Sequence, residues 1–161
     1  MEESVEKERK PADRQRECTG LPSMLREIFP GKCQDIRSYS ALTLAYVGDA
    51  IYDLIIRTLV VERGNRPVND LHRLTIKYVS ASAQAKMVQA LEGSFTEEEL
   101  AVYRRGRNSK PHTTAKNASI QDYLKATGFE AVLGWLYLQD DMERILELVR
   151  KGIEAADIER V

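Results

Sequence analysis

The sequence predicts an all-α protein, and three observations lead to that prediction. Apolar residues recur at helical spacing along most of the chain, and no segment alternates polar and apolar residues over the length of a strand. Residues suited to capping helices precede the apolar segments. With 161 residues, 43% of them apolar, the chain can build one core but hardly two.

The N-terminal part of the chain divides into an extension and a short helix. Residues 1–20 carry mixed charges and almost no apolar side chains, so they cannot bury enough surface to offset the entropy lost on ordering. We therefore expect a disordered extension over 1–20 and a single domain over 21–161. The first helix of that domain is predicted from Leu21 to Phe29, ending at Pro30.

A long helix is predicted next, from about Leu42 to Glu62, with Ser38 or Ser40 as its N-cap and Gly64 as its end. Apolar residues surround this helix on nearly all sides, as is typical of a helix that is buried all round. A domain of five or six helices offers few elements to cover it. We therefore expect a second copy of the chain to bury part of this helix.

Capping residues predict the helices that follow. Asn69 is expected to cap a segment that runs to Leu91, in which Ser80 is a candidate for a kink. Thr96 and Glu99 form a capping-box pattern for the next helix. The remaining helices are expected over Ile120–Leu138, capped by Ser119, and from Asp140 or Asp141 to about Ala156.

Two carboxylates interrupt apolar helical segments. Asp49 lies within the long apolar helix, and Glu130 interrupts a second apolar segment, GFEAVLGWLYL. An ionised carboxylate in such surroundings is costly unless it is paired, hydrogen-bonded or bound to a cation. Gly48 next to Asp49, and Gly134 one turn after Glu130, would let the two helices pack closely and bring the acids together.

Converging carboxylates without a nearby Cys or His favour a hard, oxygen-seeking cation such as Mg²⁺ over zinc. Asp53, one turn after Asp49, is a candidate further ligand. The alternative is that these acids form structural salt bridges with Arg57, Arg37 or Lys125. The pattern leaves both explanations of Asp49 open, and for Asp53 it favours the salt bridge.

A basic segment follows the capping-box helix. No Asp or Glu occurs from Leu100 through Gln121, although the net charge of the whole chain is -1. The basic and polar side chains of this segment are of the kind that contact phosphates and sugars, while simple solvation explains a charged loop equally well. Aromatic residues only flank the segment, so a duplex fits it better than a single strand.

The sequence contains no feature of a membrane or secreted protein. No segment is long and apolar enough for a membrane span, and the N-terminus has no hydrophobic signal region. Cys18 and Cys33 have no CxxC or Cys/His companion that would indicate a metal site, so reduced thiols are expected. We therefore expect a soluble, cytoplasmic protein.

Five blocks occur in order across about residues 40–154: LAYVGDAIYDLIIR, NDLHRLTIKYVSASAQA, EEELAVYRRGRNSK, KNASIQDYLKATGFEAVLGWLYL and MERILEL. Together they resemble the Mini-III ribonucleases, the short relatives of ribonuclease III. The resemblance implies an all-helical ribonuclease III endonuclease domain that acts as a homodimer on double-stranded RNA. It also implies Mg²⁺-dependent maturation of 23S ribosomal RNA precursors, with a large-subunit ribosomal protein as a candidate helper that presents the RNA.

The resemblance also implies roles for individual residues. Asp49 matches the aspartate of the GDA motif, the principal catalytic acid and a magnesium ligand of the family, and Glu130 matches its metal-binding glutamate. Mg²⁺ would activate a water for in-line attack on the phosphorus, leaving 5′-phosphate and 3′-hydroxyl ends. RNA contacts are implied for the basic block and the KN pair, namely Arg104, Arg105, Arg107, Asn108, Lys110, Lys116 and Asn117.

Two positions depart from full-length ribonuclease III, which has acids where this chain has Ala45 and Thr127. The number of metal ions therefore stays open, and Asp122 is a candidate auxiliary acid. The same departures leave a second hypothesis, a non-catalytic ribonuclease-III-like module that binds structured RNA on the ribosome. A purely structural helical protein with ion-paired acids is a third.

Overall fold

The computed structural model describes residues 20–110, 119–156 and 158, and over these residues the chain forms helices and no strand. The all-α prediction is confirmed. Of the extension expected over 1–20, only Gly20 lies within the described residues. The helices are α1 (Leu21–Ile28), α2 (Ala41–Glu62), α3 (Val68–Val79), α4 (Ala81–Leu91), α5 (Glu97–Arg107), α6 (Ile120–Leu138) and α7 (Met142–Ala155).

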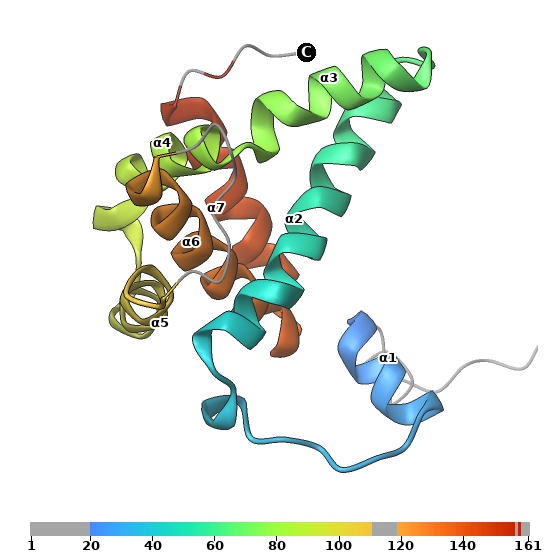
Figure 1. Ribbon diagram of the computed structural model, residues 1–161. Coiled ribbons are helices and arrows are strands. Elements are labelled where there is room, and N and C mark those ends of the chain that lie inside the picture. The colour runs from blue at the N-terminus through green and yellow to red at the C-terminus, as the bar shows by residue number, and fades with distance from the viewer. Residues whose placement is uncertain (1–19, 111–118, 157, 159–161) are drawn as a thin grey trace, which may run out of the picture.

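Helix α6 occupies the centre of the fold, with α2, α4, α5 and α7 packed around it (Figure 1). The pair α2 and α6 makes the most extensive contact between helices. Between them, Tyr52 and Phe129 are both fully buried and meet edge to face, with ring centroids 5.7 Å apart. None of the described helices has the length and apolar character required to cross a bilayer.

Several helix starts were predicted correctly from their capping residues. The side chains of Ser40, Ser119 and Asp141 each accept a backbone N–H in the first turn of α2, α6 and α7. Thr96 and Glu99 form the complete capping box at the start of α5. Local hydrogen bonding therefore sets these boundaries, with little help from the rest of the fold.

The prediction that Asn69 caps the third helix is wrong. Helix α3 begins at Val68, after Pro67, whose side chain makes no capping hydrogen bond. The ring of proline restricts φ to values that lead into a helix, so the helix starts without a side-chain cap. Ser80 produces a full break rather than a kink, because its extended backbone ends α3 while its hydroxyl oxygen caps α4.

Helix α5 is fastened to α7 at its N-terminal end by a buried ion pair. Glu99 is 1% exposed, and the Arg144 guanidinium donates to its carboxylate at 2.8 Å and to the Ser94 carbonyl oxygen at 2.8 Å. A buried carboxylate needs this degree of compensation. The pair therefore fixes the direction of α5, whose last turn carries three arginines.

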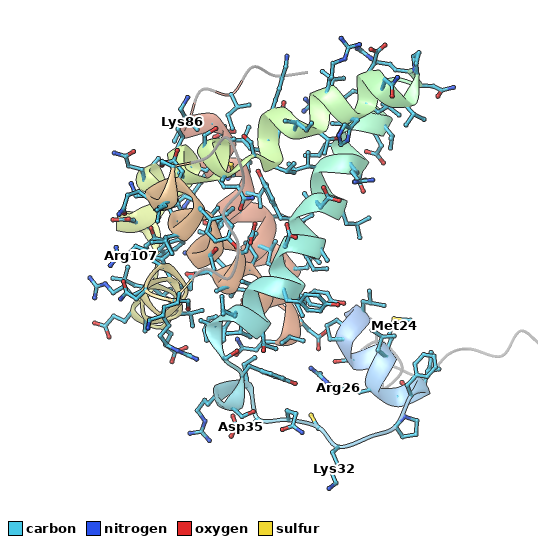
Figure 2. All side chains as sticks on the ribbon, in the orientation of Figure 1. Met24, Arg26, Lys32, Asp35, Lys86 and Arg107 are labelled. Carbon is cyan, nitrogen blue, oxygen red and sulfur yellow. The ribbon has the colours of Figure 1, made fainter. Side chains whose placement is uncertain are left out.

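Helix α1 lies beside the lower ends of α2 and α6 and is held by polar contacts (Figure 1). Asp140, in the turn between α6 and α7, accepts a hydrogen bond from the Ser23 hydroxyl group. Arg26 lies on the side of α1 that faces the body of the molecule (Figure 2) and donates to the Leu138 carbonyl oxygen at 2.8 Å. These contacts leave the apolar side chains of α1 facing outward, among them Ile28 and Phe29.

In the single chain α2 is not covered all round, in agreement with the expectation that the helices of one domain leave part of it exposed. Tyr46 is 81% exposed, Leu54 59% and Val61 51%. With Ala50, these residues lie along one side of the helix, which we call the outer face of α2 and which Arg57 interrupts between Leu54 and Val61. This face is uncovered because α3, α5 and α6, the helices in contact with α2, all pack on its other side.

Candidate active site

The site is built on a direct backbone contact between α2 and α6. A methyl group on Gly48 would overlap the carbonyl oxygen of Glu130, and one on Gly134 would overlap the carbonyl oxygen of Leu44. Only glycine permits two helices to approach this closely. The predicted close packing at Gly48 and Gly134 is confirmed, and it places Asp49 one residue from a position that touches the backbone of Glu130.

The two predicted acids influence each other electrostatically. Burial, followed by the negative charge of Asp49, raises the pKa of Glu130 to about 8. Burial, followed by the negative charge of Asp53, raises the pKa of Asp49. Among the described residues neither Asp49 nor Glu130 forms an ion pair with Lys, Arg or His. The described residues therefore offer these two acids no paired cation that would stabilise their ionised forms.

Of the salt bridges proposed as the alternative explanation, the structure contains the one between Asp53 and Arg57. Arg57 pairs with Asp53 at 2.6 Å, and Arg37 pairs with Asp35 at 2.8 Å. Asp53 thus forms a salt bridge with the residue one helical turn after it. Asp49 pairs with neither arginine. Its position in an apolar helix had predicted a buried side chain, but Asp49 is exposed.

Asp122 lies apart from the two acids along α6. It occupies the first turn of the helix, eight residues before Glu130, which corresponds to a rise of about 12 Å. Within the part of the chain that the structure describes, no group of three or more Asp, Glu, His or Cys side chains forms a metal cluster. The site is therefore a two-carboxylate centre formed by Asp49 and Glu130.

Gln84 is a site residue that we did not identify from the sequence. It lies in the first turns of α4, is 2% exposed, and donates from Nε2 to the Glu130 carboxylate at 3.0 Å. Its position offered a signal, because Gln84 precedes Val88 by four residues and Leu91 by seven, on the buried face of the helix. A polar side chain at such a position requires a partner.

The predicted RNA-binding residues gather at the C-terminal end of α5. Arg104, Asn108 and Lys110 are exposed, whereas Arg105 donates to the Tyr39 carbonyl oxygen at 2.8 Å. Figure 2 shows Arg107 on the same side of the view as Lys86 of α4.

Some of these basic residues also have structural contacts. The Arg107 guanidinium lies 5.4 Å from the centre of the Tyr103 ring, which holds it in a cation–π contact. Lys116 and Asn117 fall outside the described residues. The described part of this basic segment therefore combines the exposed cations of Arg104 and Lys110 with the guanidinium groups of Arg105 and Arg107, whose directions are fixed by contacts within the protein.

Comparison with known proteins identifies clear relatives. The chain matches the model of the Ribonuclease III domain over residues 42–141. It is 47% identical to the Mini-ribonuclease 3 of Clostridium tetani over 130 residues, which cover 78% of this chain and 86% of that protein. It is 48% identical to the Mini-ribonuclease 3 of Enterococcus faecalis over 118 residues, covering 72% and 89% respectively.

A solved structure agrees with these relatives. The crystal structure of a Fusobacterium nucleatum protein superposes with a TM-score of 0.69 at 30% sequence identity. The match covers 76% of this chain and 99% of that one. The similarity in sequence is thus accompanied by similarity in fold.

Proposed function

Because the chain belongs to the ribonuclease III family, and within it to the Mini-ribonuclease 3 group, it is an endoribonuclease, and we propose that it cleaves double-stranded RNA with Mg²⁺ held by Asp49 and Glu130. The observation that carries the proposal is the pair of interacting carboxylates at the contact of α2 and α6. They have no cationic partner among the described residues.

The residues present fit a magnesium ion. Both ligands are carboxylate oxygens, which Mg²⁺ prefers, and its charge would favour the ionised forms that burial and neighbouring negative charges disfavour. Two protein ligands also suit Mg²⁺, which usually retains several waters and binds substrate phosphate. Asp49 and Glu130 would hold the ion on α2 and α6, the helix pair with the closest backbone contact.

The bound ion would supply Lewis acidity, lowering the pKa of a water and stabilising charge on the scissile phosphate. The chain supplies rigid positioning, since Asp49 and Glu130 stand on two helices locked together at Gly48 and Gly134. Hydrolysis would leave 5′-phosphate and 3′-hydroxyl ends. Asp49, which is exposed at the edge of the outer face, is the acid more accessible to a phosphodiester.

We assign RNA backbone contact to the end of α5 and the segment after it. Arg104, Asn108 and Lys110 offer exposed donors, and the fixed guanidinium groups of Arg105 and Arg107 flank them. Binding through phosphates releases counterions, so affinity should fall steeply as salt concentration rises. Lys116 and Asn117 remain predicted contacts on the strength of the resemblance.

The outer face of α2 supports a homodimer. Three large apolar side chains, Tyr46, Leu54 and Val61, are exposed on one strip of one helix. Exposed apolar patches commonly mark protein interfaces. A second copy would cover the strip, and would place two Asp49 carboxylates near one two-fold axis, as cleavage of both strands of a duplex requires.

The biological setting rests on the family resemblance of the sequence alone. We propose that the enzyme matures the ends of 23S ribosomal RNA in the cytoplasm, with a large-subunit ribosomal protein as a helper that presents the folded RNA. The family name supports the setting, whereas the two-carboxylate site supports the chemistry.

The decisive experiment is incubation of duplex RNA with the protein, with and without Mg²⁺, beside Asp49→Asn and Glu130→Gln. Loss of a metal ligand removes several kcal/mol of transition-state stabilisation, so we expect about a thousandfold slower cleavage while the fold survives. Asp70→Asn is the matched control, because Asp70 pairs with Arg73 on α3. Full cleavage by Asp49→Asn would reject the assignment.

The same experiment separates the other hypotheses. Binding of duplex RNA without cleavage, unchanged in Asp49→Asn, would support a non-catalytic RNA-binding module. A structural protein would show no rise in melting temperature with Mg²⁺, whereas a ligand that binds only the native state must raise it.

A further inference from the structure

The Gln84 side chain joins the break between α3 and α4 to the acid on α6. Its Nε2 atom donates to the Val79 carbonyl oxygen at 3.0 Å and to Glu130 Oε1 at 3.0 Å. Because an amide nitrogen carries two hydrogens, both of its donors are used. Gln84 therefore connects a fixed backbone atom to the carboxylate of the candidate metal site.

The Val79 carbonyl determines which way the amide points. It belongs to the last turn of α3, where carbonyl oxygens lack a partner within the helix, and the extended backbone of Ser80 ends that helix. A carbonyl oxygen only accepts hydrogen bonds, so the NH₂ end of the amide must face it. The same NH₂ end then faces Glu130 and can only donate to it.

Other polar groups near Glu130 do not take this role. The Tyr52 hydroxyl group donates to the Tyr78 carbonyl oxygen at 2.7 Å, so its hydrogen is already used. Within the described part of the chain, the Gln84 amide makes the single hydrogen bond recorded for the Glu130 carboxylate. One carboxylate oxygen is thus held by the protein, which leaves the other for a different partner.

The Oε1 atom of Gln84 provides an independent observation. It is buried and has no hydrogen-bond partner among the described residues. A buried amide oxygen without a donor costs about 1–3 kcal/mol, so an apolar residue of the same size would be favoured at this position if stability alone mattered. Costs of this kind are expected where a residue serves a functional site.

We propose that Gln84 is a positioning residue, which uses the Val79 carbonyl as an anchor to hold the Glu130 carboxylate in the orientation that binds the divalent cation. The inference rests on the metal site proposed above. Residues behind the direct ligands of a metal commonly change affinity or activity by about 10–100-fold when they are replaced.

The test compares Gln84→Met with the wild type. Methionine has a similar length and volume but cannot donate a hydrogen bond, so the carboxylate loses its tether without a large cavity. We expect Mn²⁺ affinity, measured by electron paramagnetic resonance without RNA, to fall by about tenfold or more. The Mg²⁺ concentration for half-maximal cleavage should rise by a similar factor, with the KM for RNA unchanged.

Two controls separate positioning from a general loss of structure. Gln89→Met, at an exposed position of the same helix, should leave Mn²⁺ affinity unchanged. In a Glu130→Gln background, Gln84→Met should cause no further loss of Mn²⁺ affinity, because the two changes remove the same interaction. Equal losses of affinity in both backgrounds would overturn the proposal, as would a Gln84→Met protein that binds Mn²⁺ like the wild type.

A measurement on the wild-type protein covers the case in which Gln84→Met does not fold. In nuclear magnetic resonance spectra, the side-chain NH₂ signals of Gln84 should shift during a Mg²⁺ titration, while those of Gln89 stay in place. Unmoved Gln84 signals in a protein that binds Mg²⁺ would overturn the role of Gln84 alone. A wild-type protein that binds neither Mn²⁺ nor Mg²⁺ would instead overturn the metal site, and this inference with it.

Discussion

Both faces of α2 carry large apolar side chains, but the two faces differ completely in their surroundings. On the inner face, Leu44 and Tyr52 are fully buried and Gly48 touches the backbone of α6. On the outer face, Tyr46 is 81% exposed. Large apolar side chains on both sides indicate that each face will be covered, but they do not indicate which helix or partner covers it. The glycine marks the face that the same chain covers.

The difference between the faces also separates the two acids. Glu130 approaches α2 from the inner side, where burial raises its pKa to about 8. Asp49 lies near the border with the outer face and is exposed in the single chain. One acid is therefore held by the core and the other is exposed, and variants can probe each side separately.

The largest effect is expected on the inner face. In Gly134→Ala the new methyl group would meet the Leu44 carbonyl oxygen, a backbone atom that cannot rotate away. We expect the free energy of unfolding to fall by about 3 kcal/mol or more, measured by urea denaturation. Gly93→Ala is the control, because nothing lies within 4 Å of the added carbon there. Equal tolerance of both substitutions would disprove the close contact.

A smaller effect is expected from the protonation of Glu130. The unfolded carboxyl group titrates near 4.5 and the folded one at about 8, so stability present at pH 4.5 is lost as the pH rises to about 8. Without metal, the loss should be on the order of 3 kcal/mol. Urea denaturation in a chelator should show that Glu130→Gln removes most of this dependence. An unchanged dependence in that variant would assign the titration to another group.

The smallest effect is expected on the outer face. Tyr46→Asp places a charge in the proposed dimer contact while leaving the core untouched, so the dissociation constant of the dimer should rise about tenfold, a change of about 1.4 kcal/mol. Val68→Asp is the control, since Val68 is 77% exposed at the start of α3. Analytical ultracentrifugation measures both. A wild-type protein that stays monomeric at micromolar concentration would contradict the dimer.

Part of the fold and site could be predicted because the signals are local. Ser40, Ser119 and the capping box at Thr96 act within one turn of helix, so the residues themselves specify them. The prediction failed at Asn69, because the restricted φ of Pro67 starts α3 without any side-chain cap. Gln84 was overlooked because both of its partners lie outside its own helix.

The sequence by itself determined the helical class, most helix starts and the two acids that do not suit apolar helices, because helix caps and hydrophobic periodicity depend on near neighbours in the chain. Only the tertiary structure decided which face of α2 is covered and that Gln84 anchors Glu130. Those outcomes depend on how α2, α4 and α6 meet. The sequence predicted the backbone contact at Gly48 and Gly134, but it did not indicate that α4 packs beside this contact and brings Gln84 to Glu130.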